Sequence, residues 1–179
     1  MEDTVFAGYW PGLSGKALYP SNVKDRYGII KKDFIKCTGV IEMSGLEHFD
    51  ISNTVLETLG IRIVEFTRER VVASMPVTPK VHQPFGIMHG GVSLVLAETV
   101  ASMGSYLFID AATRRAVGLE INANHIRSKS DGEVRAIGIP VHVGNKTMVW
   151  DIRVLDENER LICISRCTMA IIDVTKNKE

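Results

Sequence analysis

The sequence predicts an α+β domain in which an antiparallel sheet packs around one long helix. Three observations lead to this fold class. Residues 91–109 are apolar over most of a helical wheel, which is typical of a buried helix. Two strand-like segments with a polar turn between them precede this helix, and four strand-like segments follow it. One helix among many strands joined by short turns fits the α+β class.

The first part of the predicted domain holds a short helix and a hairpin. Ser52 is expected to cap the helix, and Gly60 suits its C-terminal end. Residues 61–66 and 71–77 have the apolar content of strands, and the polar residues 67–70 predict the turn between them.

On the wheel of the long helix, large apolar, small and polar side chains fall on different sides. The large side chains are Val92, Leu96, Val100, Met103 and Leu107. The small-residue stripe is Ser93, Ala97, Ala101 and Gly104, and the opposite side holds Gly91, Glu98, Ser102 and Ser105.

Four more strands are expected after the long helix. They span residues 116–126, 133–143, 147–155 and 161–172. Turn signals separate them at close spacing, among them Asp131-Gly132 and Gly144-Asn145. Because short links favour antiparallel neighbours, we expect the four strands to form a meander.

Length and composition indicate one packed domain. The chain has 179 residues, of which 45% are hydrophobic and 23% charged. We assign residues 46–173 to the domain, residues 174–179 to a polar tail, and residues 1–45 to an N-terminal extension. The extension is expected to pack on the domain surface, with a lid or an oligomer contact as the alternative.

Charge and cysteine content exclude several classes of partner. The formal net charge is +0 with scattered Lys and Arg, so neither nucleic acid nor an anionic membrane is an expected partner. Glu98 argues against a membrane-spanning role for the long helix. Cys37, Cys163 and Cys167 have no disulfide or metal spacing, and no signal peptide or nucleotide-binding motif is visible. We expect a cytoplasmic protein without metal or cofactor.

The start of the long helix is the expected functional centre. Helix-start N–H groups lack partners within the helix and carry the positive end of its dipole. Gly90 and Gly91 leave room for a carbonyl oxygen, which would be held more tightly as it became an oxyanion. Gln83 and His89 can bind the same carbonyl or a water. The alternative is that the two glycines only allow a tight turn and that His89 has only a structural role in the loop.

Glu98 predicts a site that two subunits share. An enclosed carboxylate needs a reason, and Glu98 lies inside the apolar helix. It stands roughly 10 Å along the axis from Gly91, at about 1.5 Å per residue, too far from its own helix start. In a two-fold dimer one subunit can supply the helix start and the other Glu98. Ser102, one turn on, can orient a water or bond Glu98. The alternatives are that Glu98 has only a structural role, bonded by neighbouring polar groups, and that Ser102 only fills space in the core.

Other side chains are candidates for ligand contacts. An aromatic or alkyl pocket can be lined by Phe85, Met88, Met103 and Tyr106. Basic residues at strand ends or turns can meet phosphates, unless they only form a solvated surface; these are Arg127, Lys129, Arg135 and Lys146.

The motif Gln83-Pro-Phe-Gly-x-x-His89-Gly90-Gly91, followed by Leu96-Ala97-Glu98 and Ser102-Met103, resembles that of a known family. It is similar to the hotdog-fold acyl-CoA thioesterases of the phenylacetate-related type. The likeness is greatest to the group of 1,4-dihydroxy-2-naphthoyl-CoA hydrolases and the proofreading thioesterase of enterobactin synthesis. It covers about residues 50–172 and includes the stretch 122–127.

The resemblance implies a hotdog fold, in which a sheet wraps one helix, assembled as a homodimer and often a homotetramer. It implies hydrolysis of a thioester carried by coenzyme A or an acyl-carrier protein. Glu98 would act as base or nucleophile, the Gly90 amide would polarise the carbonyl, Gln83 and His89 would hold the carbonyl or water, and Ser102 would support the water. Substrate contacts would fall to Phe85, Met88, Gly91, Met103, Asn124, His125, Arg127 and Lys146.

The chain departs from the family where an arginine commonly follows a His-x-Gly turn, because Asn145 and Lys146 stand there. The rival function is a non-catalytic acyl-CoA sensor or scaffold on the same fold. A hydratase is disfavoured because the Asp/His dyad of hotdog hydratases is not visible.

Overall fold

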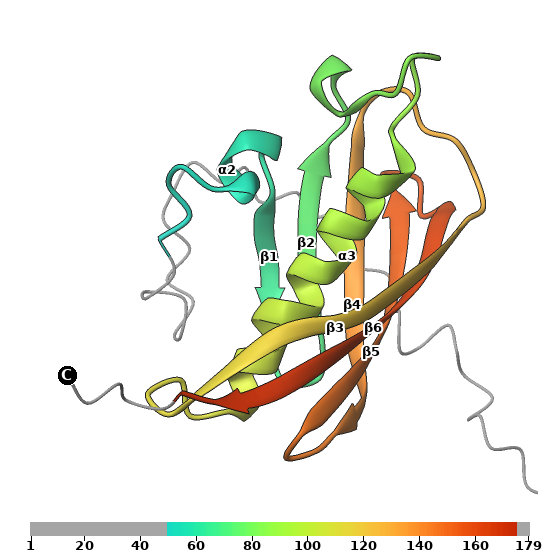
Figure 1. Ribbon diagram of the computed structural model, residues 1–179. Helices are drawn as coiled ribbons and strands as arrows, with labels where there is room; N and C mark the ends of the chain where they lie inside the picture. Colours follow the sequence, from blue (N-terminus) through green and yellow to red (C-terminus); the bar gives the residue numbers. More distant parts are fainter. Residues whose placement is uncertain (1–49, 175–179) are drawn as a thin grey trace, which may run out of the picture. The chain divides into compact units, whose positions relative to one another are not determined.

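The computed structural model describes residues 50–174, which form a six-stranded antiparallel sheet packed on one long helix (Figure 1). Helix α3, Gly90–Ser105, contributes buried residues along its whole length and contacts strands β2 to β6. The predicted fold class is confirmed. The proposed extension, residues 1–45, and Cys37 lie outside the described residues.

The remaining elements follow the predicted order. They are α2 (Val55–Leu59), β1 (Arg62–Phe66), β2 (Val71–Pro76), β3 (Arg114–His125), β4 (Glu133–Val143), β5 (Thr147–Asp156) and β6 (Leu161–Asp173), with short 3-10 turns at Pro79–Val81 and Tyr106–Phe108. Gly60 ends α2 in the left-handed conformation, as expected. The expected cap was wrong: Thr54 is the residue that precedes the helix, and Ser52 bonds the side chain of Asp50.

The order of strands in the sheet is β1-β2-β4-β5-β6-β3. Strands β4, β5 and β6 form the expected consecutive hairpins, but β3 pairs with β6 and not with β4. The four-strand meander was therefore wrong. The reason is the link of residues 126–132, which is long enough to carry the chain from the β3 edge to β4 at the centre of the sheet. Strand β4 then pairs with β2.

The C-terminal half of α3 is anchored on β5 through Trp150. A Cβ atom at Gly104 would lie 2.4 Å from the Trp150 ring, so glycine is required for this close approach. The Trp150 Nε1–H donates to the Ser105 hydroxyl at 3.0 Å. Ser105, which the wheel grouped with Glu98, is thus buried against the sheet.

The segment Gly90–Phe108 is long and apolar enough to cross a membrane by length and composition alone. Half of it is buried inside the protein, as in the core helix of a folded domain. Its apolar surface is therefore largely explained by contact with the sheet.

A buried carboxylate holds the turn between β5 and β6. Asp156 is 0% exposed and accepts hydrogen bonds from the backbone N–H groups of Asn158 and Arg160 and from the Arg160 side chain. Burial alone would raise the pKa of Asp156, but these hydrogen bonds hold that pKa below its ordinary value. Folding therefore favours the charged form of Asp156.

We expect Asp156→Asn to lower the free energy of unfolding at pH 7 by about 2 kcal/mol, because the backbone N–H groups of the turn and the Arg160 guanidinium lose a charged acceptor. A carboxylate whose pKa is lower in the folded state stabilises the fold at pH values above its unfolded-state pKa. This stabilisation is lost as the pH falls through the folded-state pKa. Below about pH 4 the wild type should therefore lose its advantage over the variant. Urea unfolding across pH 2–7 measures both effects. The exposed Asp131→Asn is the control, and equal stability of Asp156→Asn and wild type at pH 7 would contradict the prediction.

Candidate active site

The start of α3 presents an unbonded amide. His89 caps the helix: its Nδ1 accepts a hydrogen bond from the Gly91 N–H at 2.9 Å, and its carbonyl accepts from the Val92 N–H at 3.0 Å. An imidazole whose Nδ1 accepts carries its proton on Nε2, so His89 can still donate from that atom. The Gly90 N–H has no acceptor within residues 50–174. It is the free donor at the positive end of the helix dipole.

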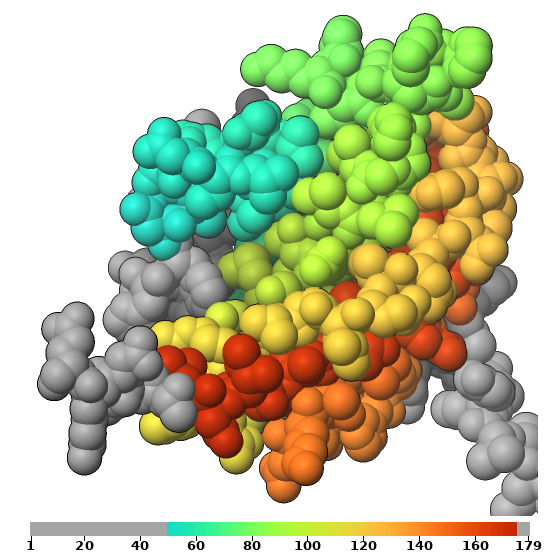
Figure 2. Space-filling view, viewed as in Figure 1, coloured from blue at the N-terminus to red at the C-terminus, as the bar shows by residue number. Residues whose placement is uncertain are grey.

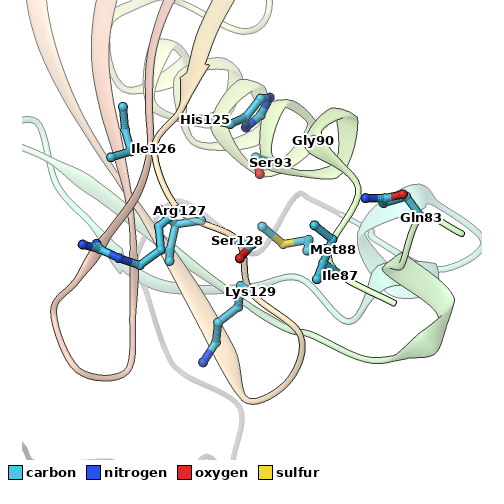
Figure 3. Close-up of a pocket in the computed structure, with 11 residues that line it drawn as sticks. Gln83, Ile87, Met88, Gly90, Ser93, His125, Ile126, Arg127, Ser128 and Lys129 are labelled. Carbon is cyan, nitrogen blue, oxygen red and sulfur yellow. The ribbon is translucent and has the colours of Figure 1, made fainter. Parts of the chain in front are cut away.

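A cavity of about 290 Å³ opens beside this amide (Figure 3). Three segments enclose it: the loop before α3, the first turn of α3, and the link that follows β3. Its lining residues are Gln83, Ile87, Met88, Gly90, Ser93, His125, Ile126, Arg127, Ser128, Lys129 and Ile162. The link that breaks the expected meander thus forms one wall of the cavity.

His125 packs directly over the start of the helix. A Cβ atom at Gly90 would lie 2.7 Å from His125 Nε2, so a larger residue at position 90 would displace the imidazole. Gln83 is oriented by its own loop, because its Oε1 accepts from the Phe85 N–H at 3.2 Å. The Gln83 side-chain NH2 group keeps its donors for a ligand.

Lys129 holds the link in place instead of facing a ligand. Its side chain is buried, and its Nζ lies 2.6 Å from Glu157 Oε1. This hydrogen bond from Lys129 holds the pKa of Glu157 below its ordinary value. The Lys129 carbonyl also accepts from the Met88 N–H at 2.7 Å, which joins the link to the loop before α3.

The charged groups of the other basic residues, on the link and on the neighbouring strands, also do not face the cavity. Figure 3 shows the charged end of Arg127 directed away from the enclosed space, and its Nη1 donates to the Leu161 carbonyl at 2.9 Å. Arg135 pairs with Glu159. Lys146 is exposed in the turn between β4 and β5, outside the cavity.

Glu98 lies outside the cavity, on the part of α3 that faces β3. It is partly exposed and makes no hydrogen bond or ion pair with any residue in 50–174. A Cβ atom at Gly118 of β3 would lie 2.3 Å from Glu98 Oε1, so the carboxylate occupies the space that glycine leaves. The β3–β6 pairing shifts register between Gly118 and Glu120, a bulge beside the carboxylate.

The two described cysteines, Cys163 and Cys167, lie on β6 and are buried and free. Burial raises the pKa of the Cys163 thiol to about 11. Burial raises the pKa of Cys167 to about 12, and the negative charges of Glu98 and Glu120 add to that shift. Both thiols are therefore held in the protonated, unreactive form at neutral pH.

We expect Gly118→Ala to lower kcat by about 10²-fold while the protein still folds. The added methyl group would meet the end of a flexible side chain, so Glu98 moves and the strand does not. Gly118 does not have a positive φ, so its backbone accepts alanine. Turnover of a thioester, the substrate that the sequence resemblance implies, and the melting temperature, measured side by side, test this. An unchanged kcat would show that the position of the carboxylate is unimportant.

The cavity brings together only some of the predicted site residues. Gln83, Met88, Gly90, His125 and Arg127 line it. The others lie outside it, namely His89, Gly91, Glu98, Ser102, Phe85, Met103, Asn124 and Lys146. Phe85 is 87% exposed and Met103 is buried. Sequence reasoning missed Ser93, although its place three residues after Gly90 puts it on the face of the helix start.

No group of three His, Cys, Asp or Glu side chains in the described part of the chain is arranged to hold a metal ion. The polar groups that meet at the cavity are instead an amide N–H, a carboxamide, an imidazole and a hydroxyl. Such groups can bind and polarise a carbonyl compound.

Comparison with known proteins places this arrangement in a family. The model of the thioesterase superfamily matches residues 85–163. ComA2 of Bacillus subtilis is 58% identical over 69% of this chain and 98% of its own length. The 1,4-dihydroxy-2-naphthoyl-CoA hydrolase of Listeria monocytogenes is 51% identical over 64% of this chain and 93% of its own. The proofreading thioesterase EntH of Cronobacter turicensis is 42% identical over 66% of this chain and 86% of its own.

Among solved structures, a mutant of thioesterase PA1618 from Pseudomonas aeruginosa superposes with a TM-score of 0.68 and 45% identity, covering 69% of this chain and 89% of that one. The chain belongs to the thioesterase superfamily. Within that superfamily it is an acyl-CoA thioester hydrolase of the hotdog fold. The resemblance seen in the motif is confirmed.

Proposed function

We propose that this protein hydrolyses an aromatic acyl-CoA thioester at a site made from the start of α3 in one subunit and Glu98 in another. The observation that carries the proposal is the unbonded Gly90 N–H in the wall of a half-open cavity. A thioester carbonyl oxygen placed there gains a hydrogen bond that strengthens as negative charge develops on it. Gln83 and His89 hold the carbonyl or the attacking water, and Ser102 supports that water.

Glu98 supplies the chemistry in one of two ways. As a base, it takes a proton from water while the water oxygen bonds to the carbonyl carbon. As a nucleophile, its oxygen bonds to that carbon, and water then hydrolyses the resulting anhydride. In both routes the C–S bond breaks, the thiolate of coenzyme A leaves and is protonated, and a free carboxylic acid remains. The lack of an ion-pair partner for Glu98 within residues 50–174 supports either role.

The geometry within one subunit supports sharing of the site. Glu98 lies roughly 12 Å along the helix from Gly90, at about 1.5 Å per residue, and does not line the cavity. Glu98 instead faces β3, which is an edge strand of the sheet and lies on the surface beside α3 (Figure 2, yellow). Val117 and Leu119 of β3 are 41% and 64% exposed. Two-fold pairing of β3 strands would cover these side chains and bring a second copy to the carboxylate.

The proposed acyl group is a ring and not a long chain. A cavity of about 290 Å³ is at the small end of ligand pockets, which span about 300–1,000 Å³. The relative from Listeria monocytogenes is named for an aromatic acyl-CoA substrate. Carrier-protein thioesters of the same acyl group are a second possible form of substrate, since a relative is named as a proofreading thioesterase.

The test is a hydrolysis screen of the purified full chain. Acetyl-, palmitoyl- and benzoyl-CoA, and benzoyl groups on an acyl-carrier protein, are compared by release of free thiol. We expect kcat/KM to be highest for a benzoyl thioester. Binding of these compounds without any hydrolysis would favour the sensor or scaffold, and preference for palmitoyl-CoA would reject the aromatic assignment.

A further inference from the structure

The link that forms one wall of the cavity is bonded at its start, at its end and in its middle. At its start, the Ile126 N–H donates to the Ile162 carbonyl at 2.8 Å. At its end, the Gly132 carbonyl accepts from the Val77 N–H at 2.8 Å. Between these two anchors, Lys129 bonds the link to the rest of the domain. The position of the wall beside the cavity therefore depends on the contacts of Lys129.

Lys129 makes these contacts in two directions. Its carbonyl accepts from the Met88 N–H at 2.7 Å, so the link is joined to the loop that leads into α3. Its Nζ lies 2.6 Å from Oε1 of Glu157, in the turn between β5 and β6. Figure 3 shows the charged end of Lys129 directed away from the cavity. One residue thus ties two walls of the cavity to a turn that does not line it.

Glu157 is fitted closely against the end of the link. Its Oε2 accepts from the Glu133 N–H at 3.4 Å, and a Cβ atom at Gly132 would lie 2.9 Å from its Oε1. Gly132 also has a φ of +74°, so glycine is favoured there for two reasons. The carboxylate therefore contacts the link at its end as well as at Lys129.

The Lys129 ammonium depends on Glu157 for its charge partner. Its side chain is 6% exposed, and a buried charge is costly unless it is paired. Asp131 is a weaker partner, because its Oδ1 lies 3.9 Å away and its side chain is 86% exposed. The hydrogen bond from Lys129 holds the pKa of Glu157 below its ordinary value, so this carboxyl is charged at neutral pH. Without Glu157, the ammonium would be drawn toward water and the link with it.

We propose that the ion pair between Lys129 and Glu157 is a clamp that sets the size of the acyl pocket. The inference rests on the proposed function, in which the thioester carbonyl binds at the Gly90 N–H and the acyl group fills the cavity. With the clamp formed, the link keeps its place against the loop before α3. With the clamp broken, this wall gives way. A yielding wall positions a ring poorly, and it admits a longer acyl chain. Lys129 and Glu157 are positioning residues, because they act on the substrate through the link.

The experiment compares acetyl-, benzoyl- and octanoyl-CoA as substrates of the wild type and of Lys129→Met, which keeps an unbranched side chain but loses the charge. In the variant we expect the ratio of kcat/KM for benzoyl-CoA to that for octanoyl-CoA to fall about tenfold or more. The kcat/KM for acetyl-CoA should change least, because a two-carbon group fills little of the cavity. A role in folding alone would lower the melting temperature and leave the ratio as it is in the wild type.

Two more variants test whether the two residues act as a pair. Glu157→Gln keeps an acceptor oxygen but not the charge, so it should shift the ratio in the same direction by a smaller factor. The double variant should show the ratio of Lys129→Met alone, because the ammonium that position 157 would bond is already gone. Glu157→Gln also keeps the inference testable if Lys129→Met does not fold.

The matched control is Arg70→Met. It breaks the ion pair with Glu65, which has the same N–O distance of 2.6 Å and lies in the β1–β2 hairpin, outside the cavity. We expect this variant to keep the wild-type ratio. An equal shift in Arg70→Met would reject the clamp, because the loss of any ion pair would then have the same effect.

The outcomes that overturn the inference differ from those that overturn the proposed function. Hydrolysis of all three thioesters with the same relative kcat/KM values in the wild type, Lys129→Met and Glu157→Gln rejects the clamp and leaves the proposed function standing. No turnover of any thioester by the wild type rejects the proposed function, and the inference with it.

Discussion

Glu98→Gln is expected to lower kcat for a benzoyl thioester by about 10³-fold, because glutamine can neither take a proton from water nor attack the carbonyl carbon. The substitution keeps the size of the side chain, so the space beside Gly118 stays filled. Folding should persist, since Glu98 has no ion-pair partner within residues 50–174. Initial rates of thiol release and the melting temperature measure the two effects independently.

The matched control for Glu98→Gln is Glu120→Gln. Both carboxylates act on the same thiol, because both help to raise the pKa of Cys167. Glu120 lies on exposed β3 and accepts a hydrogen bond from Asn122, whereas Glu98 projects from α3. We expect Glu120→Gln to retain most of the turnover. A similar loss in both variants would mean that the local negative charge, and not the Glu98 side chain itself, is what catalysis requires.

Most of the fold could be predicted because its signals are local. Apolar runs of strand length between Gly, Pro and polar turns located the strands with ends that differ by at most two residues. The placement of β3 at the edge beside β6 could not be predicted, because nothing local in residues 116–126 records which strand they pair with. The link 126–132 is long enough for β3 to pair with either β4 or β6. Which of the two strands it pairs with depends on how the sheet closes around α3.

The candidate site also has parts that local sequence signals could predict and parts that they could not. The position of Gly90 at the cavity could be predicted because a glycine pair at a helix start has a physical use independent of tertiary contacts, and Gln83 lies in the loop just before it. The cap made by His89 was missed because Ser, Thr, Asp and Asn are the usual caps. The contact of Glu98 with Gly118 joins two elements that are distant in sequence, and only the fold reveals it. Ser93 was grouped with small packing residues because a buried serine gives no sign in the sequence that its hydroxyl group is unsatisfied.

Mixed dimers made from two inactive variants are expected to recover about half of the wild-type activity, because a shared site requires only one good half from each subunit. One chain carries Glu98→Gln and the other Gly90→Val, whose side chain would meet His125 at the helix start. The chains are co-expressed with different affinity tags, and the mixed pairs are isolated by two successive purifications. In each mixed pair the intact helix start faces the intact Glu98 at one of the two sites.

The reciprocal pairing is the control, since it reverses the expectation. When a wild-type chain is paired with a chain carrying both Gly90→Val and Glu98→Gln, each shared site has one defective half and activity should be close to zero. A site contained within one subunit predicts the opposite for both pairings: no activity from the two single variants together, and about half of the wild-type activity from the wild type with the double variant. That opposite pattern, or failure of the two tags to purify together, would reject a site built from Gly90 of one subunit and Glu98 of another.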